Sequence, residues 1–261
     1  MVLVDEHGVS NSNRRPPSSA SASGVGVGGA HGSGTGSPAG VRGLVLIGGG
    51  GHAVVVAEAA ALAGGPGALA GFLDDNPSAT LASLEFRLPH PFPAPPYLGA
   101  LADMARLARC DWIVAIGDVV QRRRVLAALA GSGRMDATAA SGGPASVIHP
   151  DASISPSATV GPGTFVGPLA VVHSRARVQP HGVINSGAIV EHDCEIGENV
   201  HVAPGAVLGG SVHVGFDTLI GLGARVLPGI RIGSGCIIGA GAVIIRDVVD
   251  GQRVVGVPGR T

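Results

Sequence analysis

The segment SGAIVEHDCEIGENVHVAPGAVL, residues 186–208, decides the fold because an aliphatic residue returns in it at every sixth position. The same phase runs in both directions, without exception, from residue 148 to residue 244. Its members are Ile148, Ile154, Val160, Val166, Val172, Val178, Ile184, Val190, Ile196, Val202, Leu208, Val214, Ile220, Val226, Ile232, Ile238 and Ile244. Four residues after most of them stands a small residue, such as Ala188 or Ala206. This hexapeptide period predicts a parallel β-helix.

Each hexapeptide is expected to form one short face of the coil, with its aliphatic residue pointing inward and its small residue at the turn. Three hexapeptides make a triangular rung, and successive rungs stack about 4.8 Å apart. Residues 147–261 therefore predict a coil domain of about five to six rungs, about 27 Å long. Coils of the hexapeptide class are left-handed, so the expected fold is a left-handed parallel β-helix.

The residues before the coil, 43–146, predict a small Rossmann-like α/β domain. Its expected elements are a strand at residues 44–47, a glycine loop at 48–51, a helix to about residue 63, a strand that ends in Asp74 and Asp75, a helix near residues 99–109, a strand at 112–117 and a helix from about Val119. Strands that alternate with helices favour a parallel sheet. Residues 131–146 are interpreted as a linker, and the Gly/Ser-rich residues 1–42 as a disordered leader.

Composition excludes several classes of function. The chain of 261 residues has a formal net charge of -1 and no lysine, so neither a broad attraction for nucleic acid or anionic lipid nor a lysine Schiff base is expected. The cysteines, Cys110, Cys194 and Cys236, are too widely spaced for a disulfide framework, which fits a reducing cytoplasm. We find no signal peptide and no run of about 18 apolar residues, and so expect no membrane span.

The opening segment also concentrates titratable residues, Glu191, His192 and Asp193, among Val, Ile, Ala and Gly. A histidine beside a carboxylate is typical of a general base, although a solvated coil surface also carries such residues. Neighbouring side chains of a strand point to opposite sides, so Asp193 can orient His192 only if the backbone turns between them. His201 follows half a rung later, and the two histidines could share a site only across a subunit boundary.

The two parts together resemble sugar acetyltransferases of the sialic acid O-acetyltransferase and bacillosamine or perosamine N-acetyltransferase type. The resemblance covers residues 43–260 and rests on LIGGGGHAVVV, GFLDD, AIGDVVQRRRV, VIHPDASIS, INSGAIVEHDCEIGENVHVAPGAVLGGSVHVG and VVGVPGR. It implies a cytoplasmic homotrimer with active sites at its subunit interfaces, acetyl-CoA as co-substrate, no metal, and a nucleotide-linked amino sugar as acceptor for surface polysaccharide synthesis. The expected reaction is direct N-acetylation.

The resemblance also implies roles for individual residues. His192 corresponds to the general base, Asp193 to the acidic residue that increases its basicity, and Asn185 to an asparagine near the reacting centre. The residues expected to contact acetyl-CoA are His201, Gly210, Leu222, Ala240 and Arg260. The residues expected to hold the nucleotide sugar are Gly50, Gly51, His52, Asp74, Asp75 and Asp118. Asp193 is one methylene shorter than the glutamate of some relatives, and Glu191 is an alternative partner for His192.

Other interpretations remain open at this point. The loop GGGGHA, residues 48–53, satisfies G-x-G-x-x-A and could bind NAD, although a nucleotide sugar suits so short a domain better. Arg122 to Arg124 are interpreted as a solvated helix face. The sequence does not separate N- from O-acetylation. A zinc enzyme of the γ-carbonic anhydrase kind would use His173, His181, His192, His201 or His213, and a non-catalytic coil would use none of these residues.

Overall fold

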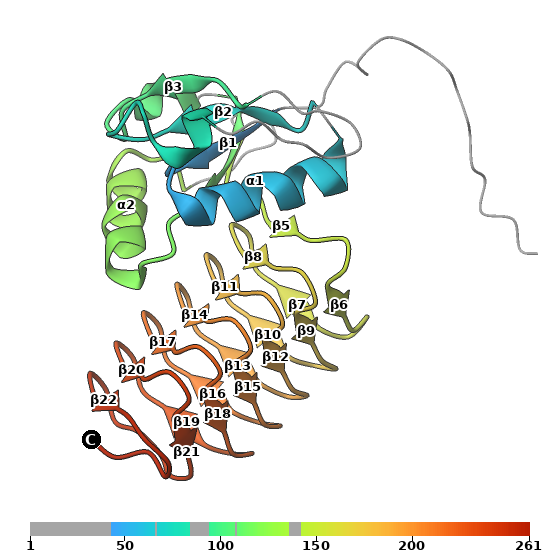
Figure 1. Ribbon diagram of the computed structural model, residues 1–261, viewed down its shortest axis with the longest axis vertical. Coiled ribbons are helices and arrows are strands. Elements are labelled where there is room, and N and C mark those ends of the chain that lie inside the picture. The colour runs from blue at the N-terminus through green and yellow to red at the C-terminus, as the bar shows by residue number, and fades with distance from the viewer. Residues whose placement is uncertain (1–42, 66, 84–93, 108, 136–141) are drawn as a thin grey trace, which may run out of the picture. The chain divides into compact units, whose positions relative to one another are not determined.

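The computed structural model describes residues 43–65, 67–83, 94–107, 109–135 and 142–261. These residues belong to one compact unit, Gly40–Thr261. The expected leader, residues 1–42, lies outside the described residues. Figure 1 shows longer helices in the N-terminal part of this unit and a stack of short strands in its C-terminal part. Within the described residues, no helix combines the length and the apolar character that a membrane span requires.

The N-terminal domain is an α/β structure with a parallel sheet, as the sequence predicts, and helices pack on both faces of the sheet. Its elements are β1 (Leu44–Ile47), α1 (Gly51–Gly64), β2 (Leu69–Leu73), the 3₁₀ helix η1 (Thr80–Ser83), β3 (Tyr97–Gly99), the 3₁₀ helix η2 (Met104–Leu107), β4 (Asp111–Val114) and α2 (Val119–Gly131). The strands form one parallel sheet in the order β3-β2-β1-β4. Leu44 and Leu46 of the central strand pack with α1, and Val45 and Ile47 pack with α2, because neighbouring side chains of a strand face opposite layers.

The helix expected near residues 99–109 is wrong. Residues 97–99 form strand β3 at the edge of the sheet, and only the short η2 follows. Gly99 has a φ of 140°, which is not helical, and the Asp103 carboxylate accepts a hydrogen bond from the Ala100 N–H at 3.0 Å. A side chain that bonds a nearby backbone N–H competes with helix formation, so the segment turns instead.

The segment interpreted as a linker is partly built into the domain. Gly131 ends α2, and residues 136–141 lie outside the described residues. Beyond them, Pro144 forms a parallel bridge with Trp112, whose N–H donates to Gly143 O at 2.9 Å and whose carbonyl accepts from the Ala145 N–H at 2.8 Å. The chain therefore leaves the α/β domain along the edge strand β4 rather than as a free connection.

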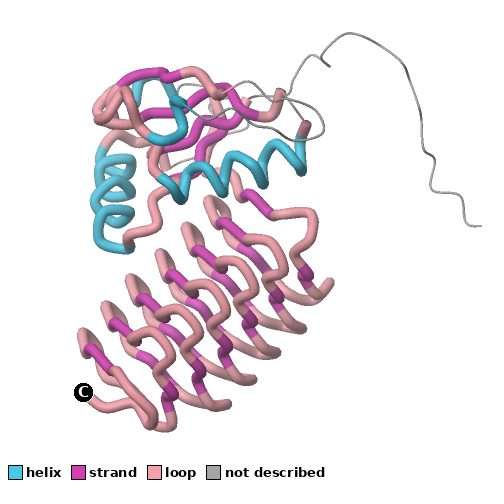
Figure 2. Tube along the Cα trace, viewed as in Figure 1, coloured by secondary structure: helices cyan, strands magenta, loops and turns pink. Residues whose placement is uncertain are grey.

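The C-terminal domain is a parallel β-helix with three sheets (Figure 2). The first coil sheet contains β5 (Val147–Ile148), β8 (Phe165–Val166), β11 (Val183–Ile184), β14 (His201–Val202), β17 (Leu219–Ile220), β20 (Ile237–Ile238) and β22 (Arg253–Val254). The second contains β6 (Ser153–Ile154), β9 (Val171–Val172), β12 (Ile189–Val190), β15 (Val207–Leu208), β18 (Arg225–Val226) and β21 (Val243–Ile244). The third contains β7 (Thr159–Val160), β10 (Arg177–Val178), β13 (Glu195–Ile196), β16 (His213–Val214) and β19 (Arg231–Ile232).

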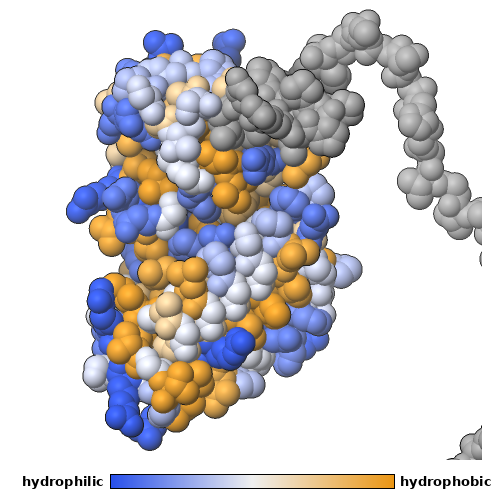
Figure 3. Space-filling view, viewed as in Figure 1, coloured by the Kyte–Doolittle hydropathy of each residue, from blue (hydrophilic) through white to orange (hydrophobic). Residues whose placement is uncertain are grey.

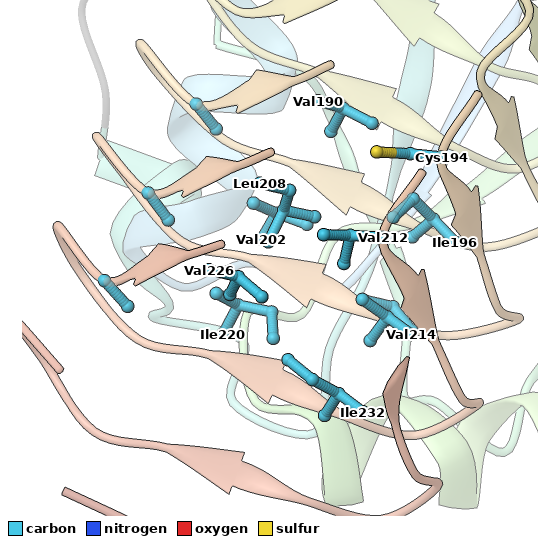
Figure 4. Close-up of a cluster of buried hydrophobic side chains, with 14 of the residues drawn as sticks. Val190, Cys194, Ile196, Val202, Leu208, Val212, Val214, Ile220, Val226 and Ile232 are labelled. Atoms are coloured by element: carbon cyan, nitrogen blue, oxygen red, sulfur yellow. The ribbon is translucent and has the colours of Figure 1, made fainter. Parts of the chain in front are cut away.

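The core of the coil is the aliphatic column that the period predicts (Figure 4). Every sixth residue from Val166 to Ile244 is buried, and Cys194 and Cys236 occupy small positions inside the same core. The prediction of burial is wrong for Ile148, which is 39% exposed, because its strand β5 is the last of its sheet and no rung before it covers that end of the core. The first rung, at the end of the stack, is thus only partly filled.

Three turn residues join the coil to the α/β domain. His181, Asn199 and Asp217 precede first-sheet strands in successive rungs, and each has a left-handed backbone, with φ of 61°, 57° and 57°. Such a conformation is uncommon outside glycine and suits Asn, Asp and His best. The ring of His181 stacks on the Trp112 ring at 5.9 Å between centroids, with 5° between the planes.

The solvated helix face expected at residues 122–124 is wrong for its first two members. Arg122 is 1% exposed, and its Nε donates to Asn199 Oδ1 at 2.6 Å. Arg123 donates to Asp217 Oδ1 at 2.7 Å. Burial lowers the pKa of Arg122 to about 10, so the guanidinium stays charged at neutral pH. Hydrogen bonds from Arg122 and Arg123 therefore bind helix α2 to the coil. From the sequence alone, the same arginines look like a basic surface of the helix.

Acid is expected to destabilise the contact between the two domains. Burial lowers the pKa of His52, His181 and His201 to about 4 each, whereas an unfolded histidine titrates near about 6.5. Between about pH 4 and about pH 6.5 these three histidines are protonated in the unfolded chain and neutral in the folded chain. The free energy of unfolding is therefore greatest above about pH 6.5 and falls as the pH drops toward about 4. The fluorescence of Trp112, the single tryptophan, measures the transition.

The matched variant for this prediction is His181→Phe, which retains an aromatic ring for the stack but binds no proton. Its unfolding temperature should fall less than that of the wild type as the pH is lowered from about 7 to about 5. Parallel pH dependences in the two proteins would contradict the role of His181.

Candidate active site

A pocket of about 400 Å³ lies where the strands of the α/β sheet end. In open parallel sheets, ligands bind beyond the carboxyl ends of the strands. The pocket brings together all the residues expected to hold a nucleotide sugar, namely Gly50, Gly51, His52, Asp74, Asp75 and Asp118. The structure therefore assembles these six positions, which come from three separate segments of the chain, around one space.

The glycine loop presents an open helix end to this pocket. Helix α1 starts at Gly51, and the residue before it, Gly50, makes no side-chain cap. The first N–H groups of such a helix have no intrahelical partner and attract phosphate. A Cβ atom built on Gly50 or Gly51 would meet no atom within 4 Å, so these glycines leave space that the protein itself does not fill. That arrangement suits a phosphate group.

The acidic residues of the pocket have structural partners that the sequence does not reveal. Asp74 accepts hydrogen bonds from the Gly49 N–H at 2.7 Å and from the Asn76 N–H at 2.8 Å, so both of its oxygens hold the loop. Asp75 Oδ1 accepts from the Leu101 N–H at 3.0 Å. Asp118 Oδ1 accepts from the Gln121 N–H at 2.7 Å and caps α2. Asp75 and Asp118 thus each direct one carboxylate oxygen to backbone and retain a second oxygen for a ligand.

His192 and Asp193 form a hydrogen-bonded pair in the turn between β12 and β13. Asp193 has a φ of 60°, so the backbone turns there, and its Oδ2 lies 2.8 Å from His192 Nδ1. A carboxylate at neutral pH only accepts hydrogen bonds, and Nδ1 must therefore carry the hydrogen. The neutral ring then presents the lone pair of Nε2. This is the geometry of a general base with an orienting carboxylate.

Gly210 lies directly against the His192 ring, one rung further along the coil. A Cβ on Gly210 would approach His192 Cε1 and Nε2 to 2.6 Å, closer than packed atoms allow. The family resemblance implies that Gly210 contacts acetyl-CoA. The structure shows a different property of this residue, namely that its missing side chain makes room for the imidazole.

The sequence analysis missed Arg175. This residue stands one rung before Asp193, with a φ of 59°, and its Nε and Nη2 donate to the two Asp193 oxygens at 2.6 and 2.7 Å. The hydrogen bonds from Arg175, and then the bond from His192, hold the pKa of the Asp193 carboxyl well below its usual range. The sequence contains a signal for this contact, because residues three hexapeptides apart stack on each other in the coil, as Arg175 and Asp193 do.

Asn185 and His201 form a second group, next to the α/β domain. His201 Nδ1 lies 2.8 Å from the carbonyl oxygen of Gly117, so it carries the hydrogen, and Nε2 accepts from Asn185 Nδ2 at 3.1 Å. Asn185 Oδ1 accepts from the Ser186 N–H at 2.8 Å. Burial lowers the pKa of His201 to about 4, so the ring is neutral and both of its nitrogens are engaged.

The predicted catalytic residues therefore separate into two groups within one chain. Asn185 follows β11 of the first coil sheet, whereas His192 follows β12 of the second. Gly117, which binds His201, also lines the glycine-loop pocket. The Asn185 group thus adjoins the pocket of its own chain, and the His192 group is on a different corner of the coil.

The remaining predicted contacts of the co-substrate lie toward the C-terminal end of the coil. Leu222 and Ala240 follow first-sheet strands in successive rungs, and both are exposed. Arg260 is also exposed and exchanges two backbone hydrogen bonds with Val255, at 2.8 and 2.9 Å.

The histidines considered as zinc ligands do not gather in one chain. Within the described residues, no three His, Cys, Asp or Glu side chains are close enough to hold a metal ion. His181 and His201 are engaged with Trp112 and Gly117 of the α/β domain.

Comparison with known proteins supports both halves of the architecture. Residues 43–129 match the family model of the PglD N-terminal domain, and residues 177–210 and 211–246 match that of the bacterial transferase hexapeptide (six repeats). No curated protein sequence matches the chain.

Several solved structures are similar over most of the chain. PerB from Caulobacter crescentus, in complex with CoA and GDP-perosamine, is 33% identical with a TM-score of 0.70, over 84% of this chain and 97% of that one. The acetyltransferase domain of PglB from Neisseria gonorrhoeae FA1090, in complex with acetyl coenzyme A, is 34% identical with a TM-score of 0.69, over 84% and 98%. WeeI from Acinetobacter baumannii AYE is 25% identical with a TM-score of 0.68, over 84% and 98%. The chain thus belongs to the hexapeptide-repeat sugar acetyltransferases that carry a PglD-type N-terminal domain.

Proposed function

We propose that this protein transfers the acetyl group of acetyl-CoA to the amino group of a nucleotide-linked amino sugar, for use in surface glycan synthesis. The observation that carries the proposal is the His192–Asp193 pair, whose hydrogen bond of 2.8 Å leaves Nε2 free to accept a proton. The glycine-loop pocket supports a nucleotide sugar as acceptor. Structural relatives that hold CoA with GDP-perosamine, or acetyl coenzyme A, support the choice of substrates.

In the proposed reaction, His192 Nε2 accepts a proton from the sugar amine as the amine nitrogen attacks the acetyl carbon. The N–C bond forms, the C–S bond breaks, and the CoA sulfur takes the proton and leaves as a thiol. Negative charge develops on the carbonyl oxygen and needs a hydrogen-bond donor. Asn185 uses one Nδ2 hydrogen on His201 and can offer the other to this oxygen. No covalent enzyme intermediate is required.

The active enzyme is proposed to be a homotrimer, with each site at a boundary between subunits. The separation of the Asn185 and His192 groups within one chain supports this assembly, because only a second coil would bring the two together. The coil also exposes large apolar side chains, including Leu169, Phe216, Leu222, Leu227 and Val249, and Figure 3 shows apolar patches on its surface. Because CoA and nucleotide sugars are cytoplasmic metabolites, we expect the enzyme to act in the cytoplasm.

The first test of the proposal is the release of thiol from acetyl-CoA with a panel of UDP- and GDP-linked 4-amino sugars and free sialic acid. The wild type should turn over at least one amino sugar, and His192→Ala should lower kcat by about 10² or more, because the base is lost. His173→Ala is the control, since His173 is an exposed residue of the same turn one rung earlier. Turnover of sialic acid alone would instead indicate O-acetylation, and full activity of His192→Ala would refute the base.

A second prediction concerns the space beside the imidazole. Gly210→Ala places a methyl group where the His192 ring lies, and kcat should fall by about 10² while the KM for the nucleotide sugar stays within about twofold. The unfolding temperature should change little, because the imidazole can rotate outward. Gly131→Ala, at the end of α2 in open space, is the control for adding a methyl group. Wild-type kcat in Gly210→Ala would mean that the ring position does not matter.

A third prediction separates acceptor binding from chemistry. Gly51→Ala adds a methyl group to the open space at the start of α1, and alanine is also the better helix former. The KM for the nucleotide sugar should rise by about tenfold, because the methyl group occupies the proposed phosphate position. The KM for acetyl-CoA should not change. An equal rise in both KM values, or in neither, would contradict a nucleotide site at this loop.

A further inference from the structure

Arg175 and Asp193 occupy equivalent positions of neighbouring rungs. Both residues have a left-handed backbone, with φ of 59° and 60°, in the turn that leads from the second coil sheet to the third. The Asp193 N–H donates to the carbonyl oxygen of Ser174 at 3.0 Å, which ties the two turns together. The two side chains therefore leave the coil from stacked turns with the same conformation.

Arg175 and Asp193 form a bidentate ion pair with two parallel hydrogen bonds, which we call the fork. Nε of Arg175 donates to Asp193 Oδ1 at 2.6 Å, and Nη2 donates to Oδ2 at 2.7 Å. Oδ2 is also the oxygen that accepts from His192 Nδ1, at 2.8 Å. Two parallel hydrogen bonds fix the plane of a carboxylate, which a single bond does not. The orientation of the His192 ring thus depends on a carboxylate whose own orientation depends on Arg175.

The same coil contains an arginine–carboxylate pair that lacks this geometry. Arg177 and Glu195 are also separated by one rung, and their side chains meet through one contact of 3.0 Å. The side chain of Arg177 is 62% exposed and that of Arg175 is 63% exposed, so the two arginines are equally solvated. The fork is therefore not a general result of stacking an arginine on a carboxylate.

Stability does not account for the fork either. Ion pairs at exposed positions contribute little to folding, because water screens them and ordering two side chains costs entropy. The Arg175 side chain contacts Asp193 directly, at the surface of the coil rather than in its core. What the fork does fix is the orientation of the carboxylate beside the imidazole.

We propose that Arg175 is a positioning residue for acetyl transfer, which holds the Asp193 carboxylate and, through it, the Nδ1–H tautomer and the direction of the His192 ring. This inference rests on the proposed function, because it assumes that His192 is the base. Arg175 itself does not touch the reacting atoms. Its removal is expected to lower kcat while substrate affinity is unchanged.

The test compares Arg175→Gln with the matched control Arg177→Gln in steady-state kinetics on the full chain. Arg175→Gln should lower kcat about tenfold with both KM values within about twofold, and Arg177→Gln should leave kcat unchanged. Arg175→Lys should recover only part of the rate, because an ammonium group cannot form the fork. In an Asp193→Asn background, Arg175→Gln should cost nothing further, since residues that act through one another are not additive.

Chemical rescue distinguishes positioning from a general structural effect. Arg175→Gly suits the positive φ and leaves a space for a guanidinium, and added methylguanidinium should restore kcat toward the wild-type value. Wild-type kcat in Arg175→Gln, a rise confined to the KM for acetyl-CoA, or an undiminished loss in the Asp193→Asn background would each overturn the inference. If His192→Ala is inactive and Arg175→Gln is not impaired, only the positioning role fails. If His192→Ala is fully active, the proposed base fails as well.

Discussion

The backbone hydrogen bonds between successive rungs are the constraint on which the rest of this structure depends. Strands of only two residues would not be stable alone, but each strand inside a sheet pairs with an equivalent strand above and below, as Ile189 does with Val171 and Val207. The pairing register keeps every sixth side chain inside and places residues of equivalent turns directly over one another. A change of register by one residue would move the aliphatic column to the surface. The position of every functional side chain on the coil follows from this one register.

Two corners of the coil use that stacking for different purposes. At the corner before the first sheet, His181, Asn199 and Asp217 hold the α/β domain. At the corner before the third sheet, Asp193 and Gly210 contact a single imidazole, and Arg175 binds Asp193. Turn residues with left-handed backbones are tolerated in both columns because the rungs on either side fix them. The polar contacts of the coil thus join stacked turns at its corners, whereas its apolar side chains fill the interior.

Much of this organisation could be predicted from the sequence, and the parts that could not have identifiable causes. The hexapeptide period predicts the β-helix and its core, because the burial of every sixth residue follows from a pattern of nearby residues. The partner of Arg122 is Asn199, 77 residues away, and no local pattern connects them. The helix predicted near residues 99–109 does not form, and one cause is Asp103, whose carboxylate accepts a hydrogen bond from a backbone N–H. For the candidate site, the sequence predicted the residues that line the glycine-loop pocket. The contact of Arg175 with Asp193 could be predicted only by knowing which turns of the coil are stacked.

The regular stacking also makes the coil a spacer of defined length. From His201 to Arg253 the first sheet advances by three pairings, through Leu219 and Ile237, a separation of about 14 Å at the usual strand spacing. The final pairing joins Ile237 to Arg253 across two residues fewer than the others, and the chain then folds back on itself at Val255 and Arg260. A rung inserted or removed between these levels would change the separation by one fixed increment and leave both ends intact. The number of repeats therefore sets the distance between the level of His201 and the level of Arg253, and no side chain at either end takes part in setting it.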